Sequence, residues 1–247
     1  MKNVEDNQFQ VNKENLKSAM LEAIYWWNRT EGYYHKYFCQ LDELIKYEDE
    51  FNFFITKVFK VFLNEYSVRR NIASGDKNVR DFVEKLIDSE FYQDVKSNKL
   101  EAIDYFSTKF RDTCELTNGK HSRSLLSKIA FLINPHKFVL IDTFARQSLW
   151  NFVKNDTQIR GQDLECYNVF LSVLKCFIRR YEDTFKNANS ELENFRGTDA
   201  HTFFSVNNEA FKLRVFDKLL WLNTAREKNI MIDNSGYRKF LSFPPKS

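Results

Sequence analysis

Two ionisable residues, Lys128 and Asp142, stand out in the stretch SKIAFLINPHKFVLIDTFAR, which covers residues 127–146. Each is a single polar group beside an apolar run. A lysine amine that has lost its proton is a nucleophile that forms Schiff bases with carbonyl carbons. A carboxylate held nearby stabilises positive charge that develops during a reaction. The two residue types therefore allow nucleophilic chemistry, provided that the fold brings them together.

Both residues also have an ordinary structural explanation. Lysine is almost never fully buried, and an isolated lysine on a helix usually keeps its amine in water while its stem packs along the surface. Aspartate is a favoured N-cap, because its carboxylate accepts hydrogen bonds from the first helical turn. The stretch LIDTFARQSL, residues 140–149, has the form of such a cap. Capping alone would explain Asp142.

The elements that carry the two residues are predicted to be helices. Apolar residues recur at spacings of three and four over residues 122–133, which predicts a helix. Asn134-Pro135 ends it, because proline disfavours helical backbone in the residue before it. A short apolar connection, KFVLI, then leads to a second helix that Asp142 opens and that runs to about residue 154.

Helical periodicity extends over most of the 247 residues, and the chain has only 6 glycines and 3 prolines. Such a scarcity of helix-breaking residues favours long helices. We predict an all-α fold of about ten helices, a single domain over residues 1–247 with two packed lobes, in which the N-terminal helices pair with the last one. Further helices are predicted over 14–28, 31–63 in at least two segments, 79–95, 100–116, 161–188 and 208–227, with a turn at 74–78 and irregular structure at 195–205.

The overall charge is close to balanced, with 37 basic and 34 acidic side chains and a formal net charge of +3. The distribution is less even, because residues 116–146 contain five lysines and arginines against one aspartate, and two histidines as well. A local basic patch is a better indication of nucleic-acid binding than overall charge. Most charge clusters are nevertheless solvated faces, and this alternative stays open.

Neither the cysteines nor the histidines have the spacing of a metal site. No CxxC or HxxxH pair is present, so we expect neither a metal site nor a cofactor, and we expect reduced thiols. The polar N-terminus and the lack of any apolar run of about 18–20 residues predict a cytoplasmic protein without a membrane partner. The cysteines are Cys39, Cys114, Cys166 and Cys176, and the histidines are His35, His121, His136 and His201.

The arrangement of Lys128, the connection PHKFVLID, Asp142-Thr143 and then Arg146 resembles the core of the helix-hairpin-helix DNA glycosylase superfamily. In detail it is similar to the divergent bacterial 8-oxoguanine-glycosylase-like group, whose closing helix is similar to FDKLLW at 216–221. The usual glycine-rich hairpin before the lysine is replaced here by SRSLLS, which fits the divergent group better than the main one. The resemblance implies a degenerate helix-hairpin-helix core, with a core lobe over about 79–155.

The resemblance also implies an activity, that of a DNA glycosylase with AP-lyase activity. Lys128 would be the Schiff-base nucleophile and Asp142 its electrostatic or general-base partner, with burial and cations such as Arg123 lowering the lysine pKa. The partner would be DNA, expected to be double-stranded, with the target base flipped into a pocket of a monomeric protein. The implied DNA contacts are Lys120, His121, Arg123, Ser124 and Arg146, and the implied pocket residues are Leu132, Phe216 and Trp221.

The substrate and two other classes of function remain open. The excised base could be an oxidised purine or a bulky phage-modified base such as glucosylated hydroxymethylcytosine, which would indicate anti-phage defence. The chain could instead be a catalytically inactive DNA-binding module of the same fold. It could also be a helical protein-interaction scaffold, in which Lys128 is solvated and Asp142 only caps a helix.

Overall fold

The computed structural model describes residues 10–113, 115–117, 119–155, 159–190 and 208–227. Within these ranges the protein has no strand, and it has 11 continuous helices when π-helical turns are counted with the helices that they interrupt. The predicted all-α fold of about ten helices is confirmed. Cys114, His201 and the predicted irregular segment 195–205 lie outside the described residues.

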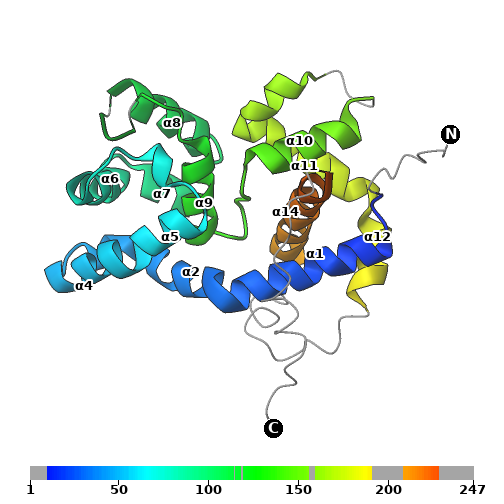
Figure 1. The fold of residues 1–247 in the computed structure, drawn as a ribbon, viewed down its shortest axis with the longest axis horizontal. Coiled ribbons are helices and arrows are strands. Elements are labelled where there is room, and N and C mark those ends of the chain that lie inside the picture. The colour runs from blue at the N-terminus through cyan, green and yellow to red at the C-terminus, as the bar shows by residue number, and fades with distance from the viewer. Residues whose placement is uncertain (1–9, 114, 118, 156–158, 191–207, 228–247) are drawn as a thin grey trace, which may run out of the picture.

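The first lobe holds the helices from α2 to α9 (Figure 1). Its core is rich in phenylalanine: the ring of Phe38 packs against those of Phe54, Phe59 and Phe62. The π-helical η2 (Phe54–Phe59) joins α4 to α5, and short 3-10 turns follow at η3 (Arg69–Asn71) and η4 (Glu115–Thr117). The helices are α2 (Gly32–Phe38), α3 (Leu41–Leu44), α4 (Glu48–Phe53), α5 (Lys60–Glu65), α6 (Asp76–Asp88), α7 (Phe91–Lys96), α8 (Ala102–Thr113) and α9 (Arg123–Ile133).

The second lobe is built around the last helix. Helix α14 packs against α1 and α10, which confirms the predicted pairing of the N-terminal and last helices (Figure 1). Helix α1 continues through the π-helical turn η1 (Trp27–Glu31) into α2, so one continuous helix passes from the second lobe to the first. The other elements are α1 (Lys13–Trp26), α10 (Thr143–Val153), η5 (Gly161–Glu165), α11 (Tyr167–Arg180), α12 (Glu182–Asn189) and α14 (Asn208–Glu227).

The segment 134–141 connects α9 in the first lobe to α10 in the second (Figure 1). Its second half, residues 138–141, is buried and is hydrogen-bonded to both lobes. The backbone N–H of Ile141 donates to Ser127 Oγ of α9 at 3.1 Å, and the hydroxyl of Tyr167 in α11 accepts from Val139 N and donates to Val139 O. The range 79–155 predicted as a core lobe crosses this division, since α6–α9 lie on one side of the connection and α10 lies on the other.

Two stretches predicted as single helices are interrupted. The range 79–95 is split between α6 and α7, where Glu90 adopts a left-handed conformation with φ of 70° and turns α7 towards α9. The range 161–188 is split into η5, α11 and α12, with Tyr181 outside helical geometry. The helices on either side of each break are amphipathic, and the helical spacing of apolar residues continues through the break. The spacing alone therefore does not predict the break.

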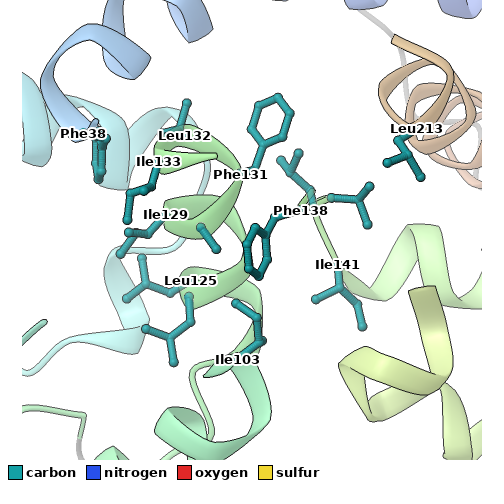
Figure 2. Packing of buried hydrophobic residues seen from close by; sticks show 14 of the residues in the cluster. Phe38, Ile103, Leu125, Ile129, Phe131, Leu132, Ile133, Phe138, Ile141 and Leu213 are labelled. Atoms are coloured by element: carbon teal, nitrogen blue, oxygen red, sulfur yellow. The ribbon is translucent and has the colours of Figure 1, made fainter. Parts of the chain in front are cut away.

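Helix α9 is the central element of the fold and is buried from Leu125 to Ile133. Leu125 and Ile129 point into the first lobe, whereas Phe131 points towards α14, beside the connecting segment (Figure 2). A helix that is apolar all round is buried on every side. In the described part of the chain, no helix is long and apolar enough to cross a bilayer.

Candidate functional site

Lys128 lies in the middle of buried α9, and only 5% of the residue is exposed. Its Nζ donates to the hydroxyl of Ser124, one helical turn earlier, at 2.9 Å, and approaches the Ser124 carbonyl oxygen at 3.5 Å. The solvated lysine assumed by the scaffold alternative is therefore wrong. Helix α9 packs against α2, α7 and α8 of the first lobe, and Phe131 on its other side contacts Arg214 of α14.

Burial lowers the pKa of Lys128 below its ordinary value, because a charged ammonium loses its hydration inside the protein. The carboxylates of Asp142 and Asp217 oppose this shift, and the guanidinium groups of Arg214 and Arg70 reinforce it. The amine therefore lies where α9, the start of α10, the middle of α14 and the η3 turn come together. A lysine with a lowered pKa at such a junction has the property that nucleophilic catalysis requires.

Asp142 caps α10, as its structural explanation predicts. Its Oδ1 accepts a hydrogen bond from Ala145 N at 2.8 Å, and its backbone is extended, as at an N-cap. The same carboxylate acts electrostatically on Lys128 and on Asp217. Capping and a role beside Lys128 are thus compatible, since the cap fixes the position of the carboxylate at the end of the connecting segment.

A buried ionic cluster made of Glu31, Arg214, Asp217 and Tyr66 adjoins the lysine. The Arg214 guanidinium donates to both oxygens of Glu31 from one side and to Asp217 from the other. The Tyr66 hydroxyl donates to Glu31 Oε1 at 3.0 Å, and the Arg214 guanidinium lies 5.1 Å from the ring centroid of Phe131 in α9. Arg214 is only 2% exposed, so both carboxylates are paired away from water.

Asp217 of the cluster and Lys218, the next residue of α14, have pKa values displaced in opposite directions. Burial raises the pKa of Asp217 to about 6, although Arg214 and Lys218 act against the rise. Burial and the positive charge of Arg214 lower the pKa of Lys218 to about 8, and its Nζ lies 4.7 Å from the ring centroid of Trp26. Such shifts concentrate at functional sites, although structural ion pairs produce them too.

Two of the predicted DNA contacts, Arg123 and Arg146, form ion pairs within the protein. Arg123 pairs with Asp104 of α8, with Nε 2.6 Å from Oδ1, and Arg146 pairs with Glu165 at 3.0 Å. The cations that reinforce the lowered pKa of Lys128 are Arg214 and Arg70, not the Arg123 suggested by the sequence.

The other predicted DNA contacts lie before and within the first turn of α9. Lys120 and His121 are both exposed. The His121 ring contacts Arg111, with 2.5 Å between Nε2 and Nη1. Burial and the neighbouring arginines lower the pKa of His121. Ser124 is the one residue of this group that the structure brings into contact with Lys128.

Two of the three predicted pocket residues are part of the core. Leu132 is buried, and its carbonyl oxygen lies 2.7 Å from His35 Nδ1. Phe216 is buried, and its ring packs against those of Phe177 in α11 and Phe185 in α12. Only Trp221 is partly exposed, and its ring packs against Phe144 of α10, two residues beyond Asp142.

Three residues of this site were not predicted from the sequence: Glu31, Arg214 and Asp217. A signal for two of them was present, because Arg214 and Asp217 are charged residues one turn apart inside the apolar run LRVFDKLLWL. Nothing in the local pattern identified Glu31, which is the last residue of the π-helical turn and reaches Arg214 of α14 from there. Among the described residues, no group of three or more metal-ligating side chains is present, and Cys39, Cys166 and Cys176 are free thiols.

Comparisons with protein-family models, with curated proteins and with solved structures found no match to this chain.

Proposed function

We propose that this protein is a DNA glycosylase with AP-lyase activity, in which Lys128 is the nucleophile and Asp142 stabilises positive charge on the sugar. The observation that carries this proposal is the buried Lys128 amine, whose pKa burial lowers, within electrostatic reach of a carboxylate fixed by a helix cap. Lysine is conspicuous in such a position, because a buried amine without a role is costly and is rarely retained.

The chemistry assigns a separate task to each residue. When the neutral Lys128 nitrogen bonds to C1′ of the deoxyribose, the bond from C1′ to the base breaks and the base leaves with the electron pair. The sugar carries positive charge as this happens, and the Asp142 carboxylate stabilises it. The nitrogen passes one proton to the departing base, the bond from C1′ to O4′ breaks as the sugar ring opens, and O4′ takes the second proton from the nitrogen, which leaves an imine. Removal of a C2′ proton then expels the 3′ phosphate by β-elimination.

The target base has to leave the duplex to reach a buried amine. Phe144, two residues beyond Asp142, packs against the partly exposed Trp221 of α14, and we assign these two rings to contact with a flipped base. The substrate is either an oxidised purine or a bulky phage-modified base such as glucosylated hydroxymethylcytosine. Lys120, His121 and Ser124 lie at the start of α9, where they would meet the DNA backbone.

Borohydride trapping tests the proposal directly. Duplex DNA with an abasic site supplies an aldehyde at C1′, which condenses with the amine to an imine and water, and borohydride reduces the imine to a stable amine. We expect a covalent complex with the unmodified protein and none with Lys128→Met, a replacement of similar length. Lys137→Met is the matched control, because Lys137 is an exposed lysine in the same basic stretch, and it should trap normally.

Two results would overturn the lysine mechanism: no complex at excess abasic DNA, or a complex that persists in Lys128→Met. Salt-dependent DNA binding without any complex would instead indicate the inactive DNA-binding module. If trapping succeeds, duplexes carrying 8-oxoguanine, glucosylated hydroxymethylcytosine or only ordinary bases are compared for strand cleavage. The modified duplex that is cleaved identifies the substrate class.

A further inference from the structure

Charged groups from three other elements act on Lys128. The carboxylates are Asp142 at the start of α10 and Asp217 in α14, and the cations are Arg214 in α14 and the exposed Arg70 of η3. A carboxylate paired with the amine would hold it in its protonated form, which is not a nucleophile. The arrangement of these groups therefore decides whether the amine is available for reaction.

In the described residues, neither carboxylate forms an ion pair with Lys128, whose amine donates to Ser124. Asp142 accepts from the backbone at the start of α10. Asp217 accepts instead from Arg214, one turn earlier on the same helix. Asp217 is the carboxylate that could most readily approach the lysine, since it is a side chain of the helix that faces α9 and no backbone cap holds it.

Arg214 is itself fixed by groups from both lobes. Two hydrogen bonds join its guanidinium to Glu31, which also accepts from Tyr66, and the guanidinium lies over the ring of Phe131. Arginine suits this position because its planar guanidinium bonds two carboxylates at once and keeps its charge at every accessible pH.

We propose that Arg214, anchored by Glu31, is a positioning residue for Lys128: it keeps the Asp217 carboxylate in an ion pair of its own and so prevents Asp217 from pairing with the amine. The π-helical turn at Trp27–Glu31 is part of this device, because it is the segment that presents Glu31 to Arg214. π-helical turns are frequent at functional sites. The role of Lys128 as the nucleophile rests on the proposed function, but the electrostatic control can be measured without DNA.

The experiment follows the protonation of Lys128 by NMR in protein labelled with 13C at the lysine ε-carbon, with the signal assigned from its loss in Lys128→Arg. The titration midpoint is measured in the unmodified protein, in Asp217→Asn, in Arg214→Met and in the double variant. These four proteins form a double-mutant cycle, which isolates the coupling between the two sites. Arg80→Met, which removes a surface arginine paired with Glu48, is the control and should leave the midpoint unchanged.

We expect Arg214→Met to raise the Lys128 midpoint by about one pH unit, which leaves about tenfold less neutral amine at a given pH. We expect Asp217→Asn to lower the midpoint only slightly while Arg214 is present, because the carboxylate then acts on the amine without pairing with it. In the Arg214→Met background the same substitution should lower the midpoint back towards that of the unmodified protein. Either of two results would overturn the inference. One is that Asp217→Asn changes the Lys128 midpoint equally with and without Arg214. The other is that Arg214→Met does not raise the midpoint.

Arg214→Met leaves Glu31 buried without its cation, and the variant could fail to fold for that reason. The cycle is then repeated with Glu31→Gln in all four proteins, which neutralises that carboxylate and keeps its shape. The outcomes separate the two proposals. A coupled midpoint without any trapped complex supports the inference and overturns the glycosylase mechanism. A trapped complex together with uncoupled midpoints supports the glycosylase mechanism and overturns the inference about Arg214.

Discussion

At the scale of single residues, the site depends on two groups that each do something ordinary and something unusual. Asp142 caps a helix and also acts electrostatically on Lys128, whereas Lys128 is a helix residue whose side chain is buried and whose pKa burial lowers. The usual structural explanation of each residue therefore covers only part of what the structure shows, and substitutions can separate the parts.

Asp142→Asn separates capping from charge, because asparagine caps helices about as well as aspartate. We expect this variant to keep the stability of the parent protein within a few tenths of a kcal/mol and to lose about 100-fold or more of the rate of the proposed glycosylase reaction. Asp142→Ala should lose the rate and also about 0.5–2 kcal/mol of stability, as measured by urea unfolding. Full activity in Asp142→Asn would reduce Asp142 to a cap.

Lys128→Met should stabilise the folded protein at neutral pH by about 0.5–2 kcal/mol, because it removes an amine that is costly to bury. The sign of the pH dependence follows from the lowered pKa. The unfolded chain keeps the lysine proton up to about its ordinary pKa of 10.5, and the folded protein releases it at lower pH. Stability of the unmodified protein therefore rises with pH in that window, and the advantage of Lys128→Met should shrink.

Urea unfolding of both proteins at several pH values between 7 and about 10 would check this expectation. A difference that grows as the pH rises would contradict a lowered lysine pKa.

At the scale of elements, the π-helical turn between α1 and α2 brings Glu31 to the site. Its closing hydrogen bond runs from Gly32 N–H to the Trp27 carbonyl oxygen. A Cβ on residue 32 would lie 3.1 Å from that oxygen and 3.1 Å from the buried Trp27 indole nitrogen. Glycine at this position therefore serves a close approach, in a place where helix propensity alone would favour alanine.

Gly32→Ala tests this explanation through the sign of its effect. In an ordinary helix the change gains about 1 kcal/mol. Here we expect a loss of about 1–3 kcal/mol, because a backbone oxygen and a buried ring have to shift. Urea unfolding gives the sign, and near-ultraviolet circular dichroism reports on the packing of the Trp27 ring. A gain in stability would show that the turn accommodates the extra methyl group.

At the scale of the whole molecule, the ionic cluster joins parts of the chain that are far apart. Glu31 follows α1, Tyr66 follows α5 in the first lobe, and Arg214 belongs to α14 in the second lobe. The cluster therefore links the lobes as well as ordering the surroundings of Lys128.

Glu31→Ala should destabilise the protein by about 3–5 kcal/mol, because it leaves a buried arginine with one carboxylate instead of two. A domain is stable by only about 5–15 kcal/mol, so a clear fall in melting temperature and in the yield of folded protein is expected. Glu43→Ala is the matched control, since it removes a carboxylate from the exposed pair with Lys46 and should cost less than about 1 kcal/mol. Equal melting temperatures for the two variants would mean that the cluster does not hold the lobes together.

The sequence by itself determined the helical class, the ends of the helices that carry the candidate site, and the cap at Asp142. These features depend on local rules: the spacing of apolar residues, the effect of proline on the residue before it, and the capping preference of aspartate. The last helix, predicted over 208–227, has the same bounds in the structure. The breaks at Glu90 and Tyr181 escaped prediction, because the apolar spacing continues across them.

Only the tertiary structure decided which charges meet. The burial of Lys128 depends on packing around all sides of α9, and the pairing of Arg214 with Glu31 joins residues at opposite ends of the chain. Local sequence contains no information about either, because desolvation and ion pairing depend on what the distant segments bring to the same place. Arg123 shows the converse, since a basic residue close to Lys128 in sequence is paired with Asp104 instead.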